Sequence, residues 1–194
     1  NVLFIYVSTD NTEDAFRLFT ILNDRGIPLS NADILKSINI GEISEEDLDE
    51  YSKHWEYLEE KYHKGFDRFL SFVRTILLKN KPSSNLLDEY EKNIYQKNIL
   101  KKGKNTIDFL IELDGIYDKI IDLNDENLSN EYKNLVTIMK LGLHSDEWIP
   151  TVLSYFLKFE YYNLDEFIKK PNRWKEGDKI EGYINRINQY LDKK

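Results

Sequence analysis

The sequence predicts an all-α protein, a multi-helix orthogonal bundle preceded by one short N-terminal β-strand. In most of the chain, apolar residues recur every three or four positions between turn and capping residues, which is typical of helices that bury one face. Val2–Val7 is the exception. It is a continuous apolar run rich in β-branched and aromatic residues, as expected for a strand buried on both faces.

The composition is that of a globular protein. The 194 residues are 41% hydrophobic and 13% aromatic, so a packed core is expected rather than disorder. The formal net charge of -8 argues against a broad nucleic-acid-binding face, because neutralising phosphates requires clustered Lys and Arg. The chain has no cysteine, which excludes disulfides and thiolate chemistry and agrees with a reducing cytoplasm.

No membrane partner is expected from the distribution of apolar residues. No apolar run approaches the roughly 20 residues that a membrane span needs. The first residues lack the basic leader and small-residue cleavage site of a signal peptide. We therefore expect a cytoplasmic protein.

The stretch Asp14–Lys36 predicts a helix, a forced turn and a second helix. Gly26 tolerates positive φ and Pro28 cannot lie in a helix interior, so both favour the turn. Ser30 and Asp33 have the spacing of a capping box, in which each side chain accepts a backbone N–H of the first helical turn. The apolar face of the first helix contains Ala15, Leu18, Phe19 and Leu22.

The corner between these helices, Asn23-Asp24-Arg25, has two interpretations. The simpler one is an ordinary helix–loop–helix turn, in which Asn, Asp and Gly are common because of their backbone conformations. The other is a functional corner. An exposed Arg25 could bind phosphate oxygens with its forked guanidinium, and Asn23 could orient a phosphate or a metal-bound water.

The full string A-F-R-L-F-x-x-L-N-D-R-G-x-x-L-S-x-A-D-I-L-K resembles a segment of the GmrSD-type restriction endonuclease family. Members of that family look like a ParB/sulfiredoxin-like N-terminal domain, a helical region and a C-terminal HNH-type nuclease domain. The motif lies late in the N-terminal domain, where a strand is followed by helices. The positions that carry the resemblance include Asp14, Phe16, Phe19, Leu22, Gly26, Leu29, Ser30 and Asp33.

The resemblance implies an N-terminal remnant of a ParB-like domain in residues 1–40 and a helical domain in residues 41–194. The family's Asp-Gly-Gln-Gln-Arg run and an HNH-like string are both missing here. The resemblance therefore implies a non-catalytic middle fragment of an NTP-dependent, modification-sensing DNA endonuclease used in phage defence. The NTP, the divalent metal, the DNA and the missing terminal domains would be partners of the parent protein.

The resemblance also suggests nucleotide-binding residues. ParB relatives place an Asn and an Arg near bound nucleotide, before a Leu and an acidic helix start. Asn23 and Arg25 are therefore the candidates here, although they are two residues apart rather than three. Lys36 on the following helix is a third candidate. The alternative is a helical protein–protein interaction or scaffold module without nucleotide or DNA chemistry.

The remainder of the chain predicts a succession of amphipathic helices. Ser44–Asp47 is read as a second capping box, and Asp146 as the cap of a later helix. Pro150 is compatible with the first turn of that helix, where N–H groups lack helical partners. The expected helices are residues 30–40, 45–62, 66–77, 86–99, 107–123, 128–143, 147–157, 164–168 and 178–191.

Other candidate chemistry is weak. His54, His63 and His144 do not have metal-ligand spacing, and no phosphate-binding glycine loop is present. The basic stretch Lys97–Lys104 is most simply a solvated loop, with phosphate contact as the alternative. The three tryptophans could stack on bases, but at helical spacing they are more often core residues.

The strand Val2–Val7 needs ladder partners that no later segment of this chain supplies. In the parent, the resemblance places them in the missing N-terminal domain. In this chain we expect the strands of two copies to pair, giving a two-fold homodimer with antiparallel first strands.

Overall fold

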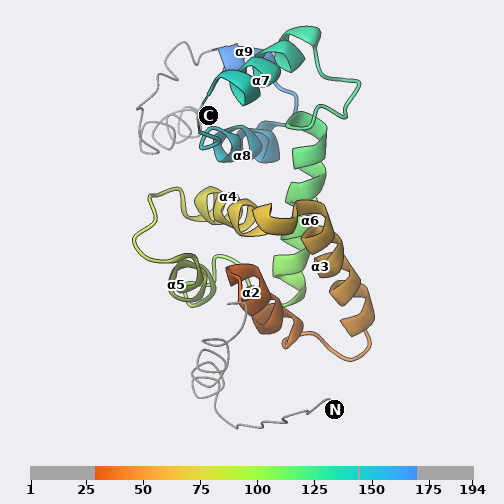
Figure 1. Ribbon diagram of the computed structural model, residues 1–194, viewed down its shortest axis with the longest axis vertical. Coiled ribbons are helices and arrows are strands. Elements are labelled where there is room, and N and C mark those ends of the chain that lie inside the picture. The colour runs from red at the N-terminus through yellow and green to blue at the C-terminus, as the bar shows by residue number, and fades with distance from the viewer. Residues whose placement is uncertain (1–28, 144, 170–194) are drawn as a thin grey trace, which may run out of the picture.

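The computed structural model describes residues 29–143 and 145–169, and these residues are helical, with no strand among them (Figure 1). This confirms the helical class, whereas Val2–Val7 lies outside the described residues. The elements are α2 (Asn31–Ile40), α3 (Leu48–Tyr62), the 3-10 turn η1 (His63–Gly65), α4 (Phe66–Leu78), α5 (Leu86–Asp88), the π-helix η2 (Glu89–Tyr95), α6 (Lys104–Ile120), α7 (Asn130–Gly142), α8 (Ile149–Phe159) and α9 (Leu164–Lys169).

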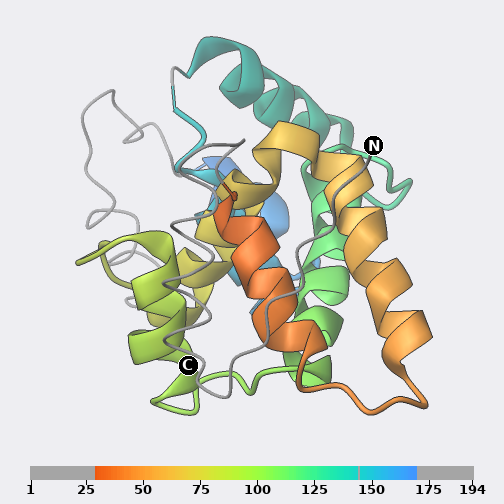
Figure 2. The ribbon, with the colours of Figure 1, turned by 60° about the horizontal axis from the view of Figure 1, so that its bottom comes forward.

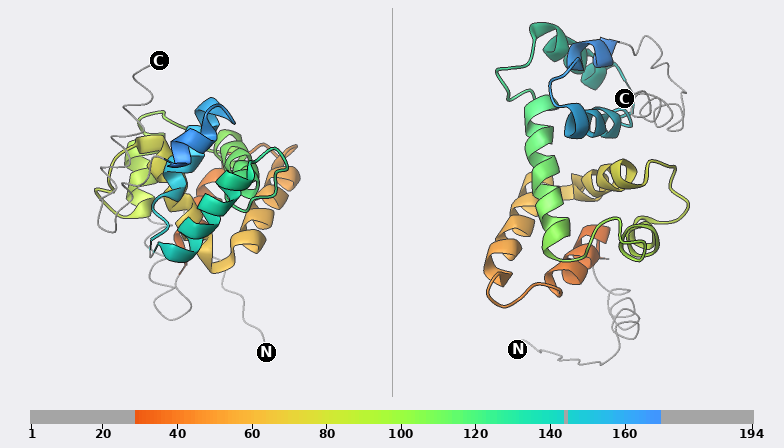
Figure 3. Two further views of the ribbon diagram at one scale, coloured as in Figure 1. Left: turned by 90° about the horizontal axis from the view of Figure 1, so that it is seen from above. Right: turned by 180° about the vertical axis from the view of Figure 1, so that it is seen from behind.

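Helix α6 connects the two ends of this helical body, with α2 and α3 near its beginning and α7 beyond its end (Figure 3). Helix α8 packs against both α4 and α6, and α9 packs against α7. Figure 2 shows α2 in front of α4, with α3 on one side and α5 on the other. The core is therefore continuous from α2 through α4 and α8.

Aromatic side chains fill the centre of the core. Trp55 and Phe66 meet edge-to-face with ring centroids 5.5 Å apart, and Tyr62 stacks on Phe69 at 4.3 Å. Trp55 and Trp148 are buried, which confirms their interpretation as core residues, while Trp174 lies outside the described residues. Burying side chains of this size contributes on the order of 1.5–3 kcal/mol each to folding.

Helices α3 and α6 run parallel with a constant register. Lys104 binds Asp47, Tyr57 donates to Asp114, and Lys61 donates to Asp118, and each pair is separated by 57 residues. If the helices were antiparallel, the number of residues between contacting partners would change along the helices. The constant sequence separation therefore shows that α3 and α6 run in the same direction. The buried carboxylate of Asp114 also accepts the Tyr62 hydroxyl at 2.7 Å.

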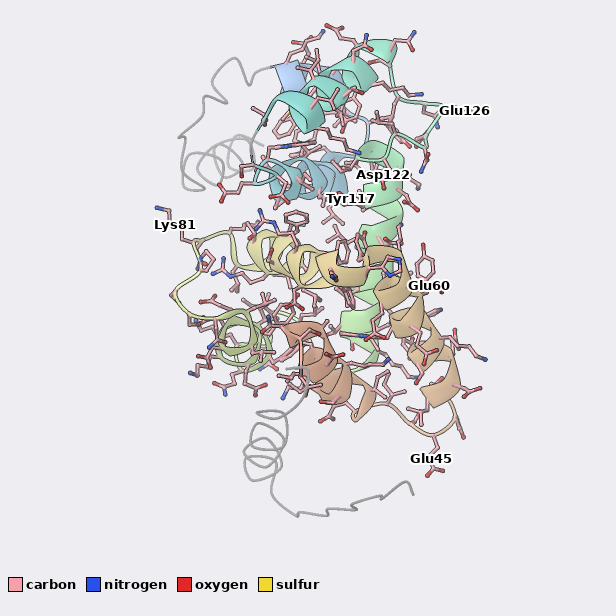
Figure 4. The ribbon with its side chains drawn as sticks, in the orientation of Figure 1. Glu45, Glu60, Lys81, Tyr117, Asp122 and Glu126 are labelled. Carbon is pink, nitrogen blue, oxygen red and sulfur yellow. The ribbon has the colours of Figure 1, made fainter. Side chains whose placement is uncertain are left out.

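Two predicted caps are wrong. The capping box predicted at Ser44–Asp47 does not form, because helix α3 begins only at Leu48. The Asp47 carboxylate accepts the Ser44 hydroxyl and the Lys104 ammonium instead of the Ser44 backbone N–H. Glu45 projects from the turn before the helix (Figure 4). Helix α8 begins at Ile149, and the Asp146 carboxylate binds Arg68 rather than the helix. In both cases a long-range ion pair takes the carboxylate that a local cap would use.

The predicted helix over residues 86–99 is shorter and differently wound. It consists of α5 and the π-helix η2, and it ends at Tyr95. The π-helix is notable because such wider turns are rare overall, and those that occur are often found at functional sites.

Pro150 lies in the first turn of α8, as predicted.

Candidate functional site

The second half of the central motif forms the start of α2. The Asp33 N–H donates to Oγ of Ser30 at 3.1 Å, and the Ser30 N–H donates to the Asp33 carboxylate at 2.8 Å. This confirms the predicted capping box, with Asp in the position that Glu or Gln usually occupies. Leu29 precedes it and is half-buried. The cap determines where the helix begins and hence how the chain enters it from the corner.

Asp67, in the first turn of α4, holds the same helix end. Its carboxylate accepts the backbone N–H of Ala32 at 2.9 Å and that of Asn31 at 3.3 Å, and it also accepts the Asn31 side-chain amide at 2.7 Å. A carboxylate at a helix N-terminus is favourable because it satisfies orphan N–H groups and complements the helix dipole. The sequence carries no signal for this contact, since Asp67 is about 35 residues away.

The candidate residue Lys36 lies on α2 facing α3. Its Nζ donates to Oε2 of Glu59 at 2.8 Å, and the indole N–H of the buried Trp55 donates to Oε1 of the same carboxylate at 3.0 Å. Lys36 is therefore part of a hydrogen-bonded chain between α2 and α3. A phosphate ligand would have to compete with Glu59 for it.

The end of α2 is held by a buried amide. The Asn39 Nδ2 donates to the Leu35 carbonyl at 2.8 Å and to the Tyr95 hydroxyl at 3.0 Å, and its Oδ1 accepts the Gly103 N–H at 3.1 Å. Gly103 has a φ of 79°, which favours glycine. This network joins α2 to the end of η2 and to the residue before α6. Sequence reasoning missed it because Asn39 looks like an ordinary polar position.

The remaining predicted site residues are not part of this geometry. Asp14, Phe16, Phe19, Leu22, Asn23, Arg25 and Gly26 lie outside the described residues. Of the three nucleotide-binding candidates, only Lys36 is therefore placed. The described chain begins at Leu29, directly before Ser30, the cap of α2.

A cleft with a volume of about 170 Å³ lies between α4, the loop of residues 79–85 and the start of α8. Its walls are mainly apolar. Ligand pockets usually occupy roughly 300–1,000 Å³, so this cleft is smaller than a typical ligand site. It has room for one side chain, or for a ligand no larger than a side chain. The lining residues are Arg68, Ser71, Phe72, Arg74, Thr75, Pro82, Ser84, Leu86, Glu89, Glu147 and Pro150.

An ion pair between Arg74 and Glu89 contributes to the wall of the cleft. The Arg74 Nη2 and Nε donate to Oε2 of Glu89 at 2.6 and 3.1 Å. The guanidinium also donates to Oδ1 of Asn80 at 2.6 Å and to the Lys81 carbonyl at 2.9 Å. The arginine thus holds the 79–85 loop against α4 through its fixed fork of donors.

The other carboxylate oxygen of Glu89 is also fully engaged. Oε1 accepts the Ser83 hydroxyl at 2.7 Å, the Ser83 N–H at 2.9 Å and the Ser84 N–H at 3.1 Å. Burial alone raises the pKa of Glu89, but the hydrogen bonds from Ser83 and Arg74 outweigh it and bring the pKa to about 2. Glu89 is the first residue of the π-helix and remains ionised at neutral pH.

Arg68 is the second arginine at the cleft. Its Nε donates to both oxygens of Asp146 at 3.0 Å, and its guanidinium lies 5.0 Å from the ring centroid of Phe72. Because Arg68 and Arg74 are both already paired with carboxylates, neither is available to bind phosphate without displacing a partner. The cleft is therefore suited to an apolar group rather than an anion.

The remaining candidate chemistry gives no metal site in the described ranges. No group of three or more His, Cys, Asp or Glu side chains there could hold an ion. His63 is exposed, His144 lies outside the described residues, and His54 packs edge-on to Tyr51 with its buried Nδ1 unpaired. One unpaired imidazole is insufficient for a metal site.

The basic stretch at residues 97–104 agrees better with a solvated loop than with a phosphate site. Three of its lysines have polar partners: Lys97 donates to Asn93, Lys102 to Glu91 and Lys104 to Asp47. These contacts hold the ammonium groups to the protein's own oxygens, so the stretch does not present a clustered set of unpaired cations.

Comparison with known proteins adds no relative: the chain matches no family model, and curated proteins and solved structures give no significant match. Within residues 29–143 and 145–169, no helix has both the length and the apolar character needed to cross a bilayer. Function is therefore inferred from the sequence motif and the contacts of α2.

Proposed function

We propose that this chain is a non-catalytic helical segment of an NTP-dependent, modification-sensing DNA restriction endonuclease of the GmrSD type, used in phage defence. In this role it joins a nucleotide-handling domain on its N-terminal side to a nuclease domain on its C-terminal side. The proposal rests first on the resemblance of Asp14–Lys36 to that family. NTP, divalent metal and DNA are assigned to the parent protein's other domains.

The attachment of α2 at three points supports the connecting role that the proposal gives to this chain. Asp67 binds the start of the helix, Glu59 binds Lys36 in its middle, and Asn39 joins its end to Tyr95 and Gly103. The corner Asn23–Gly26 lies outside the described residues and precedes this helix in the sequence, with four residues between Gly26 and Asn31. A shift of α2 would break these hydrogen bonds or move α3 and α4 with it, and the proposal assigns the transmission of motion from the corner to this helix.

The contacts continue from α4 toward the C-terminal side. Helix α4 packs on α8, and Arg68 of α4 binds Asp146 in the segment before α8. Coupling through such a network requires an element with two arrangements, and contact alone does not establish it. The proposal identifies the contact between Asp67 and α2 as the first step to test.

The decisive experiment uses the full gene product that contains this chain. Asp67→Asn weakens the attachment of α2 to α4 while leaving the rest of the protein unchanged. We expect NTP hydrolysis to be retained and NTP-dependent cleavage of modified DNA to fall at least tenfold. Asp49→Asn is the matched control, because Asp49 also lies in the first turn of a helix but is 96% exposed.

Two results would contradict the proposal. One is a gene product that neither hydrolyses NTP nor cuts DNA. The other is cleavage by the purified 194-residue chain itself, dependent on metal, surviving repurification and lost on substituting Asn23 or Arg25. Equal loss of hydrolysis and cleavage in Asp67→Asn would place its effect on stability rather than on coupling between domains.

A helical protein–protein interaction module is the second candidate. The apolar cleft formed by Phe72, Pro82, Leu86 and Pro150 favours it, since such a cleft can accept a side chain of another protein. Under this alternative the gene product lacks NTP hydrolysis altogether, and a bulky substitution such as Ser71→Trp in the cleft abolishes partner binding without changing the fold.

A further inference from the structure

Helix α7 exposes an apolar surface at its C-terminal half. The side chains of Ile138 and Leu141 are 64% and 85% exposed. They are three positions apart and therefore lie on one face of the helix. Tyr132 and Val136, on the opposite face, are fully buried against the core. We call the Ile138–Leu141 pair the α7 apolar face.

The C-terminal end of the described chain lies against the same helix. Lys169, the last residue of α9, binds Glu131 of α7 at 2.9 Å, and Ser129 donates to Asp165 at 2.6 Å. Leu141 is ten positions beyond Glu131, or about 15 Å along the helix axis. The segment that follows Lys169 therefore begins within one helix length of the α7 apolar face.

Residues 170–194 lie outside the described residues, but their sequence has the pattern that this face requires. Residues 170–177, with Pro171 and Gly177, can span up to about 26 Å when extended. The following stretch, 178–191, is long enough for a helix of about 21 Å. Its apolar residues recur at helical spacing: Ile180, Tyr183, Ile184, Ile187, Tyr190 and Leu191.

We propose that the apolar face of residues 178–191 covers Ile138 and Leu141 of α7 in the same chain. Ile138 and Leu141 are largely uncovered by apolar neighbours, and a linker of eight residues gives residues 178–191 the reach to cover them.

The N-terminal segment is a less suitable occupant. The chain enters the described region at Leu29, beside α2 and α4, and Figure 1 shows α2 and α7 at opposite ends of the molecule with α8 between them. A second copy of the chain is the remaining alternative, and its contacts would depend on protein concentration.

Hydrogen exchange on the full chain tests the contact. We expect amides in 178–191 to be protected, and Leu141→Glu to increase their exchange at least tenfold. Ile99→Glu is the matched control, because Ile99 is also an exposed apolar residue but is not part of α7. It lies in the segment before the start of α6, whereas α7 comes after the end of α6. Leu141 is so exposed that its substitution leaves the fold intact, which unchanged protection in α4 and α6 would verify. Absence of protection, or protection that Leu141→Glu does not change, would overturn the proposal.

Engineered cysteines separate the intramolecular contact from pairing of two copies. The chain has no native cysteine, so Leu141→Cys with Ile184→Cys reports only the designed contact. Under mild oxidation this pair should form a disulfide within one chain. Leu141→Cys with Arg186→Cys, on the opposite side of the predicted helix, should form at least fivefold less. Disulfides that form between chains and increase with protein concentration would assign the α7 apolar face to a second copy and refute the proposal.

Discussion

Arg74 and Glu89 form an ion pair at 2.6 Å in which both side chains are almost fully buried, with exposures of 2% and 1%. The pair joins α4 to the first residue of the π-helix and organises the loop between them. Burying two charges costs several kcal/mol each in solvation, which only good geometry and further hydrogen bonds offset. Ser83, Ser84 and Asn80 provide those hydrogen bonds.

Removing one member of this pair should be strongly destabilising. Glu89→Gln leaves the Arg74 charge uncompensated in the interior, and we expect it to lower the free energy of unfolding by about 3–5 kcal/mol. Urea denaturation followed by circular dichroism measures this. The double variant Arg74→Met with Glu89→Leu should lose clearly less unfolding free energy than the sum of the losses in the single variants Arg74→Met and Glu89→Leu. A loss below about 1 kcal/mol in Glu89→Gln would show that the pair is unimportant.

The same carboxylate should make stability sensitive to acid. The pKa of Glu89 is about 2 in the folded protein and 4.5 as an ordinary value. Because the pKa is lower in the folded protein, ionised Glu89 stabilises the fold fully above about pH 4.5. This stabilisation is lost as the pH falls toward 2 and the carboxylate becomes protonated. The difference in unfolding free energy between the protein and Glu89→Gln should therefore be constant from pH 7 to 5 and shrink by roughly 3 kcal/mol below that. A difference independent of pH down to 2.5 would contradict this.

The contact between Asp67 and the start of α2 can be measured in the isolated chain. Asp67→Asn removes the charge that accepts the Asn31 and Ala32 N–H groups, and we expect a loss of about 1–2 kcal/mol. Asp49→Asn also removes a first-turn carboxylate, so it reports the helix-dipole contribution without these contacts. Equal losses in the two variants would mean that the attachment of α2 contributes nothing.

Gly103 should be intolerant of a side chain, whereas Gly115 should accept one. Gly103 has a φ of 79°, and an added Cβ would lie 3.3 Å from Cβ of Glu42. Gly103→Ala should therefore cost about 1–3 kcal/mol. Gly115 is inside α6 with nothing within 4 Å, so Gly115→Ala should stabilise by about 0.5–1 kcal/mol through helix propensity. Thermal denaturation of both variants compares the two effects directly.

The predicted pairing of Val2–Val7 strands stays a prediction, because these residues lie outside the described ones. If the strands of two copies pair, light scattering should give a dimer for the full chain and a monomer for a version that begins at Thr9. A monomer in both cases would exclude the homodimer.

Local patterns succeeded where the interacting groups are close in sequence. The Ser30–Asp33 capping box could be predicted because both members lie within one helical turn. Asp47 and Asp146 occupy similar positions before helices, yet Lys104 and Arg68 bind their carboxylates. A capping pattern therefore predicts a helix start reliably only when no cation from a distant helix reaches the same carboxylate.

The sequence by itself determined the helical class and most buried faces. A helix that buries one face needs apolar residues about every 3.6 positions, and this pattern can be recognised within a short stretch of sequence. Only the tertiary structure decided which polar groups meet. Asp67 binds α2, Glu89 binds Arg74 and Asn39 binds Gly103 because helices distant in sequence pack side by side. A charged or amide side chain carries no periodic signal for its partner, so these contacts depend on the packing of the finished fold.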